Sequence, residues 1–257
     1  MKQTLSSLAG VFLTVSVAGQ ENSSQEVSSG RITYEEKIKL EIRLEGDAAG
    51  MAAMLPKERR SVKLLTFNNT ATLFEAGPDV DDEMATGQGD GAIKIRMVGA
   101  GENKTFTDLK SKKVTEQRDF MNRIFLVEKK MPEDQWKMTG NQKAILGYPC
   151  MEAIKQDTAG NKTVAWFTPS INISSGPSGL CNLPGMILEA DFNGGSRTYI
   201  AKSVEPVNAA SLKLQRPKDG KSVTEEEYQA IVDEKMKEMG VEPGQGGSTH
   251  MQITIKR

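Results

Sequence analysis

Residues 31–44 read RITYEEKIKLEIRL, and their pattern gives the strongest indication of the fold. Their apolar side chains fall almost perfectly on alternate positions, and the opposite positions carry only charged or hydroxyl residues. A period of two is typical of a β-strand, because successive side chains point to opposite faces of a sheet. At about 3.3 Å per residue the stretch would span about 46 Å. Such a strand predicts a large, strongly twisted antiparallel sheet with one face in water.

Ten further segments have the composition of strands, and turn-forming residues such as Asn68-Asn69, 157–161 and 193–195 separate several of them. The predicted strands are 61–67, 70–76, 92–98, 104–110, 113–119, 123–129, 150–157, 162–168, 185–192 and 196–207. Strands that follow one another without intervening helices predict a meander rather than βαβ units.

One helix is predicted, over residues 224–239. Thr224 and Glu227 form a capping box at its start, apolar residues follow at helical spacing, and Gly240 and Pro243 end it. We expect it to lie across the sheet or to cover one end of it. The alternating segment 249–257 predicts a last strand. The expected fold is therefore mainly β, a β-rich α+β domain over residues 30–257 with one C-terminal helix.

The first residues have the pattern of a signal peptide, with Lys2 followed by a short apolar stretch and small residues. About 13 apolar-leaning residues are too few for a membrane span, which takes about 20. We therefore expect residues 1–19 to be a cleaved signal and the polar residues 20–29 to be a flexible leader. The predicted location is periplasmic, secreted or on the outer surface.

The charge balance excludes the partners that need a basic protein. Lysine and arginine total 33 and aspartate and glutamate 34, which gives a net charge of -1. Binding of nucleic acid needs a surplus of cations, so none is expected. Export also makes the two cysteines, Cys150 and Cys181, candidates for a disulfide, with two buried free thiols as the alternative.

The segment Asn182-Leu183-Pro184-Gly185-Met186-Ile187 predicts a tight turn at the entry to a strand. Proline suits the first corner of a type II turn and glycine the second, which needs a positive φ. Asn182 tolerates a left-handed backbone better than most residues. A disulfide from Cys181 to Cys150 would hold this corner in place, and the turn is therefore interpreted as structural.

The motif NLPGMI at 182–187 resembles that of the GLPGLI family of exported bacterial proteins. Trp136, LGYPCMEA at 146–153 and AWFTPSINISSGP at 165–177 match the same family in order and spacing. The resemblance implies an exported protein of a Gram-negative bacterium with a β-rich fold, an open-barrel shape like that of lipoprotein carriers, and no known activity. Asp157-Thr158-Ala159 also resembles a short bacterial O-glycosylation signal, which makes Thr158 a candidate modification site.

Few residues carry recognisable chemistry. Asp79, Asp81, Glu83 and Asp90 follow the spacing of a calcium loop, but Met84 replaces the required glycine, so an acidic surface loop is favoured over a weak calcium site. The single histidine, His250, lies in the predicted last strand and makes a zinc site or a nucleophilic triad improbable. No cofactor is expected.

The sequence favours a non-catalytic exported protein. The first hypothesis is that its curved sheet binds a lipid-like or other hydrophobic ligand, with Ile38, Leu40 and Ile42 facing it. The alternative is a structural or accessory module that docks on an outer-membrane or secreted partner through a sheet edge or loop. A hydrolase that uses a pair of carboxylates is the third and weakest hypothesis, because no pair stands out.

Overall fold

The computed structural model describes residues 27–40, 56–78, 83–86, 93–96 and 103–238. The predicted signal peptide, most of the leader, Ile42 and the predicted strand 249–257 lie outside these residues. So do Asp79, Asp81 and Asp90 of the calcium template.

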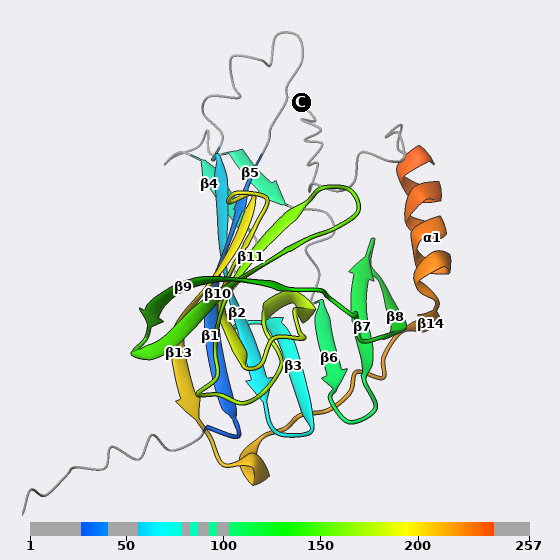
Figure 1. Cartoon of the computed structure of the whole chain (residues 1–257). Helices are drawn as coiled ribbons and strands as arrows, with labels where there is room; N and C mark the ends of the chain where they lie inside the picture. Colours follow the sequence, from blue (N-terminus) through cyan, green and yellow to red (C-terminus); the bar gives the residue numbers. More distant parts are fainter. Residues whose placement is uncertain (1–26, 41–55, 79–82, 87–92, 97–102, 239–257) are drawn as a thin grey trace, which may run out of the picture.

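The described chain is built mainly of β-strands, which form one large sheet and one separate hairpin (Figure 1). The strands are β1 (Gly30–Lys39), β2 (Glu58–Phe67), β3 (Ala71–Ala76), β4 (Glu83–Thr86), β5 (Ile93–Arg96), β6 (Lys104–Asp108), β7 (Lys113–Phe120), β8 (Arg123–Lys130), β9 (Lys137–Ile145), β10 (Tyr148–Gln156), β11 (Lys162–Thr168), β12 (Met186–Phe192), β13 (Arg197–Pro206) and β14 (Lys221–Val223). The 12-stranded sheet has the order β14-β8-β7-β6-β3-β2-β1-β13-β12-β11-β10-β9, and β4 pairs with β5.

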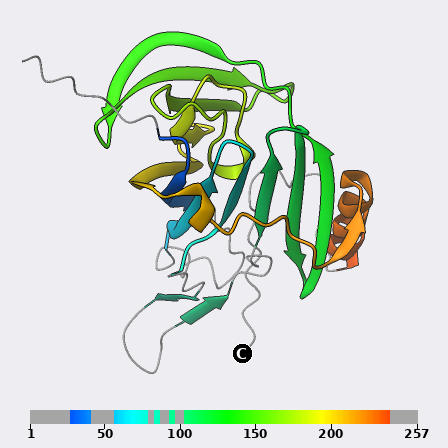
Figure 2. The same cartoon turned by 90° about the horizontal axis from the view of Figure 1, so that it is seen from below.

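The topology confirms the predicted fold class. Strands β6 to β8 and β9 to β13 form antiparallel meanders, and β1 joins the two halves by pairing with β2 on one side and β13 on the other. Among the described strands, only β14 runs parallel to its neighbour, β8. The sheet is strongly curved but does not close, because its two edges are different strands, β14 and β9 (Figure 2).

Strand β1 alternates in burial as its sequence predicts. Every second residue from Gly30 to Ile38 is buried, and the residues between them are partly or fully exposed. The strand ends at Lys39, before the predicted end at residue 44, and Leu40 is the last described residue of this segment. The buried face continues into the next strands, where Ile32 lies opposite Leu65 and Leu65 lies opposite Phe74. We call this the inner face of the sheet.

The segment between β11 and β12, residues 169–185, fills the inner face and is called the inner loop. It contains a short 3₁₀ helix, η2 (Pro177–Gly179), which contacts β3, β6 and β12. Its buried side chains, among them Ile171, Ile173, Leu180 and Leu183, belong to the same core cluster as the inner-face residues. Figure 2 shows the sheet wrapping around this loop. The concave side of the sheet is therefore packed with the chain's own side chains.

Helix α1 (Glu225–Glu238) covers the β8 end of the sheet, as predicted. The capping box is present: the Thr224 N–H donates to the Glu227 carboxylate over 2.9 Å, and the Glu227 N–H donates to Thr224 Oγ1 over 3.1 Å. Tyr228 packs edge-on against Phe125 with ring centroids 5.5 Å apart, and Arg118 binds Glu225 over 2.7 Å. The helix is thus attached by an aromatic cluster and an ion pair.

Two strands of the sheet were not predicted. Strand β9 is almost wholly exposed and has no alternation of apolar residues that would reveal it. Strand β14 is only three residues long and is defined by its pairing with β8. A short 3₁₀ helix, η3 (Ala209–Ser211), follows β13. No helix in the described ranges combines the length and the apolar character needed to cross a membrane.

Candidate functional site

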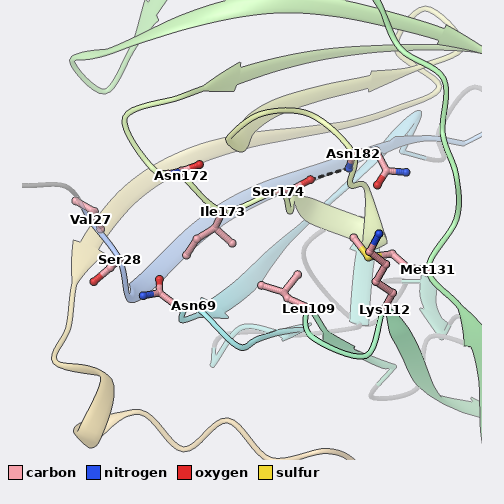
Figure 3. A pocket seen from close by; sticks show the side chains of 10 residues that line it. All are labelled: Val27, Ser28, Asn69, Leu109, Lys112, Met131, Asn172, Ile173, Ser174 and Asn182. Atoms are coloured by element: carbon pink, nitrogen blue, oxygen red, sulfur yellow. Dashed lines mark hydrogen bonds between the residues drawn. The ribbon is translucent and has the colours of Figure 1, made fainter.

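A hollow of about 540 Å³ lies at the end of the sheet where the turns β2–β3 and β6–β7 meet the inner loop (Figure 3). We call it the amide hollow because three asparagine side chains line it, one from the β2–β3 turn and two from the inner loop. Its lining residues are Val27, Ser28, Asn69, Leu109, Lys112, Met131, Asn172, Ile173, Ser174 and Asn182.

The two hairpin turns are shaped by their own side chains. Asn68 Oδ1 accepts hydrogen bonds from the N–H groups of Thr70 and Ala71, over 2.8 and 2.9 Å, which places Asn69 at the exposed tip. In the β6–β7 turn, Asp108 Oδ1 accepts from the N–H groups of Lys110 and Ser111. Asn and Asp favour such turns because their side chains bond the backbone two residues on. The turns therefore present Asn69, Leu109 and Lys112 to the hollow at defined positions.

Asn182, the first residue of the NLPGMI motif, holds in place the side of the hollow that faces the two hairpin turns. Its φ of 66° is left-handed, the conformation that the sequence analysis allowed for. Its N–H donates to Ser174 Oγ over 2.9 Å, and its side-chain amide donates to the Pro132 carbonyl over 2.5 Å. Asn182 thereby joins the two arms of the inner loop to the segment that follows β8.

The lining combines free amides with an apolar surface. Asn69 and Asn172 are exposed, and neither side-chain amide has a hydrogen-bond partner in the described part of the chain. A side-chain amide offers both donors and acceptors. Ile173 and Leu109 supply apolar surface beside them. The polar groups of the ten lining residues are amides, hydroxyls and one ammonium group, which suit hydrogen-bonded binding.

The Leu183-Pro184-Gly185 turn is tighter than the predicted type II turn. The Gly185 N–H donates to the Leu183 carbonyl over 2.8 Å, which closes a three-residue turn, and the Met186 N–H donates instead to Ile171 over 3.0 Å. Gly185 has a φ of 147°, and a Cβ there would lie 2.1 Å from the Thr168 carbonyl oxygen. The Met186 N–H, which would close a type II turn on the Leu183 carbonyl, is thus bonded to the inner-loop residue Ile171, which explains why the turn differs. Leu183, Met186 and Ile187 are buried, so these motif residues contribute to the packing of the core.

The predicted disulfide between Cys150 and Cys181 is wrong for this structure. Both cysteines are free and buried. The thiol of Cys150 contacts the Tyr148 carbonyl in its own strand, whereas that of Cys181 contacts the Pro132 carbonyl. The two sulfurs therefore have separate surroundings, and the alternative of two buried thiols holds. The corner is held by hydrogen bonds instead, since Trp136 Nε1 also donates to the Cys181 carbonyl over 2.8 Å.

A buried carboxylate on the inner face was missed by the sequence analysis. Glu36 is 5% exposed and accepts hydrogen bonds from Ser61 Oγ over 2.8 Å and from the Tyr199 hydroxyl over 2.7 Å. Lys63 Nζ and Arg197 Nε lie 3.5 and 3.7 Å from its oxygens. Burial acts to raise the pKa of Glu36, but Lys63, the two hydrogen bonds and Arg197 outweigh it and the pKa is lowered. The signal was present, because Glu36 interrupts the apolar alternation of residues 31–44.

The other predicted site residues do not gather at the amide hollow. Ile38 and Leu40 are each 8% exposed and line neither this hollow nor two smaller ones, of about 430 and 330 Å³, between β8 and α1. Thr158 is exposed in the β10–β11 turn and stays a predicted modification site. Glu83 begins β4, and no group of three or more His, Cys, Asp or Glu residues among those described could hold a metal ion.

Residues 101–230 match the family described as "N-glycanase peptide, N-terminal domain", which is about half of the chain. The chain therefore belongs to this family. None of the comparisons points to the GLPGLI family, so the resemblance drawn from the NLPGMI motif has no support from them. None of the curated proteins compared with the chain matches it.

Solved structures of PNGF-II, in two crystal forms, share the fold. One superposes with a TM-score of 0.54 at 17% sequence identity and covers 80% of this chain. The other gives a TM-score of 0.53 at 19% identity and covers 79% of this chain. The match takes in only 33% and 32% of the PNGF-II chains. This chain thus spans about one third of the length of the relative that it resembles.

Proposed function

We propose that this chain is a non-catalytic module that binds the glycan part of a glycoprotein or glycopeptide in the amide hollow. The family name supports a connection with N-linked glycans, and the match is to an N-terminal domain rather than to the whole of an N-glycanase.

The observation that carries this proposal is the pair of unengaged amides of Asn69 and Asn172 beside Ile173 and Leu109. A sugar ring has hydroxyl groups around its edge, which both donate and accept hydrogen bonds, and C–H groups on its faces. Amides match the hydroxyls because each offers a donor and an acceptor, and aliphatic side chains match the C–H faces. The volume of about 540 Å³ lies within the range of small-molecule sites, about 300–1,000 Å³.

A lipid-like ligand fits the same observations less well. The expected apolar concavity is occupied by the inner loop, whose Ile171, Ile173, Leu180 and Leu183 are buried against the sheet. The amide hollow would leave amide and lysine groups without partners around an acyl chain, and burying unpaired polar groups is costly. A polar ligand with hydroxyl groups is therefore favoured.

Docking of a partner strand on the open edge β9 is also disfavoured. Gly140 has a φ of 87°, and the pairing of β9 with β10 shifts register between Met151 and Ala153. Lys137 is exposed on the same strand. Irregularities and lysines of this kind are the features with which natural sheets prevent edge-to-edge pairing. Export to the periplasm or the cell surface, where glycoproteins would be met, remains part of the proposal.

The test is calorimetric titration of the protein with an N-glycopeptide and with the same peptide lacking its glycan. We expect only the glycopeptide to bind. Asn69→Ala and Asn172→Ala should each weaken binding by about three- to tenfold, the effect of one lost hydrogen bond. Gln215→Ala is the matched control, because Gln215 is an exposed amide outside the hollow. Equal binding of both peptides, or binding that neither asparagine variant changes, would refute the proposal.

A further inference from the structure

The rim of the amide hollow is basic. Lys112 lines the hollow, and Lys113 follows it in the chain. Lys110 follows the lining residue Leu109, and Lys130 precedes the lining residue Met131. The Met131 N–H donates to the Lys112 carbonyl over 2.9 Å, so the two segments lie side by side. All four lysines are exposed; Lys112 lines the hollow itself, and the other three are next to lining residues in the chain, so we call the four the rim lysines.

This arrangement is unfavourable for the isolated fold. Lys113 lies directly opposite Lys130 in the β7–β8 pairing, and like charges at such positions repel. Lys112 has a φ of 52°, a left-handed conformation that residues other than glycine rarely adopt. None of the rim lysines forms an ion pair within the described residues, although Lys129 in the same strand binds Glu116 over 2.5 Å. A binding role would explain why the charges are gathered here.

Neighbouring acids neutralise the rim only in part. The Asp108 carboxylate is directed into the turn by the Ser111 and Lys110 N–H groups, and these bonds, together with the charge of Lys110, lower its pKa. Asp134 is paired with Lys155 over 2.6 Å. Glu133 is exposed and is the remaining acid of the 131–134 segment. Since the whole chain carries a net charge of only -1, the cations at the rim are a local surplus.

We infer that the glycan recognised by the amide hollow is acidic and carries a carboxylate-bearing sugar such as a sialic or uronic acid. This inference rests on the proposed glycan-binding function. The neutral hydroxyls of the ligand meet Asn69 and Asn172, and its carboxylate lies toward Lys112 and the rim lysines. An anionic membrane is disfavoured as the partner, because the lysines border a hollow lined with amides rather than a flat surface with exposed apolar anchors.

The experiment compares a sialylated glycopeptide with the same glycopeptide after removal of sialic acid. At low salt we expect the wild-type protein to bind the sialylated form about fivefold more tightly, the effect of one good exposed ion pair, and this preference should shrink as salt is raised. Replacing the rim lysines with glutamine (Lys110→Gln, Lys112→Gln, Lys113→Gln and Lys130→Gln together) should abolish the preference.

The matched control removes the same charge from exposed lysines away from the hollow: Lys137→Gln, Lys213→Gln, Lys218→Gln and Lys237→Gln together. This variant should keep the preference, and circular dichroism should show both variants folded. Equal binding of the two glycopeptides by the wild type would overturn the inference and leave the proposed function standing. If the wild-type protein binds neither glycopeptide, both the inference and the proposed function are refuted. Binding to vesicles of anionic phospholipid in place of glycopeptide would also overturn the inference and assign the rim to a membrane.

Discussion

Replacing Gly185 with alanine, which adds only a methyl group, should strongly lower the stability of this protein. The residue has a φ of 147°, and a Cβ would lie 2.1 Å from the carbonyl oxygen and 2.6 Å from the carbonyl carbon of Thr168. Both are backbone atoms at the end of β11, where Thr168 pairs with Met186. They cannot move aside as the tip of a side chain would.

The expected cost follows from two contributions. A non-glycine residue in such a backbone region costs about 1–3 kcal/mol. Overpacking that shifts a backbone typically costs about 1–3 kcal/mol more. Gly185→Ala should therefore lower the free energy of unfolding by about 4 kcal/mol. For a chain of this size, about 2–4 °C of melting temperature is lost per kcal/mol, so the melting temperature should fall by about 8–16 °C.

Gly147→Ala is the matched control. Gly147 also has a positive φ, 82°, but an added Cβ would have nothing within 4 Å. It should cost only the backbone strain, about 1–2 kcal/mol. Thermal and urea unfolding followed by circular dichroism measure both variants. If Gly185→Ala is no less stable than Gly147→Ala, the close approach of Gly185 to Thr168 does not constrain the turn, and this explanation of the motif fails.

Two further predictions concern buried groups. The pKa of Glu36 is lowered in the folded state, so its carboxylate stabilises the protein above the ordinary value of 4.5, and this contribution is lost as the pH falls through the folded pKa. Glu36→Gln should therefore be less stable than wild type by about 2 kcal/mol at neutral pH, and this difference, measured by urea unfolding, should become smaller in acid. A difference in stability that does not change with pH would count against the ion pairs of Glu36. Burial raises the pKa of Cys150 and of Cys181 to about 11, so neither thiol should react with a disulfide reagent in the native protein at neutral pH, and both should react in denaturant without a reductant. A failure to detect thiols in denaturant would mean that a disulfide forms after all.

Local patterns in the sequence were sufficient to predict most of the elements. Strand β11 has the predicted bounds, and α1 begins within one residue of its predicted start, because alternation and a capping box are local signals. Strand β9 lacks such a signal, since its side chains are held by neighbours rather than by a core: Thr139 and Asn141 both bond Glu152 of β10. Edge strands of this kind depend on a partner that the local sequence does not reveal.

The amide hollow could not be predicted in this way. It is formed by contacts between segments that are distant in the chain, and local sequence patterns do not reveal such contacts. Asn69, Lys112 and Asn182 come together only because the hairpin turns and the inner loop meet at one end of the sheet. The spacing of Cys150 and Cys181 likewise contained no information about the distance between their sulfurs. Glu36 was the exception, because an acid at an inward position of an otherwise apolar alternation requires buried partners.

The position of β1 has a consequence for biosynthesis. Its neighbour on one side, β2, follows within 30 residues, but its other neighbour, β13, ends at Pro206, which pairs with Gly30. During synthesis, the hydrogen bonds between β1 and β13 can therefore form only after most of the chain has been made. Sheets that depend on pairings between residues distant in the chain fold slowly, and their unpaired strand edges are prone to aggregation until folding is complete. We expect a chain truncated before β13 to aggregate rather than to fold in part.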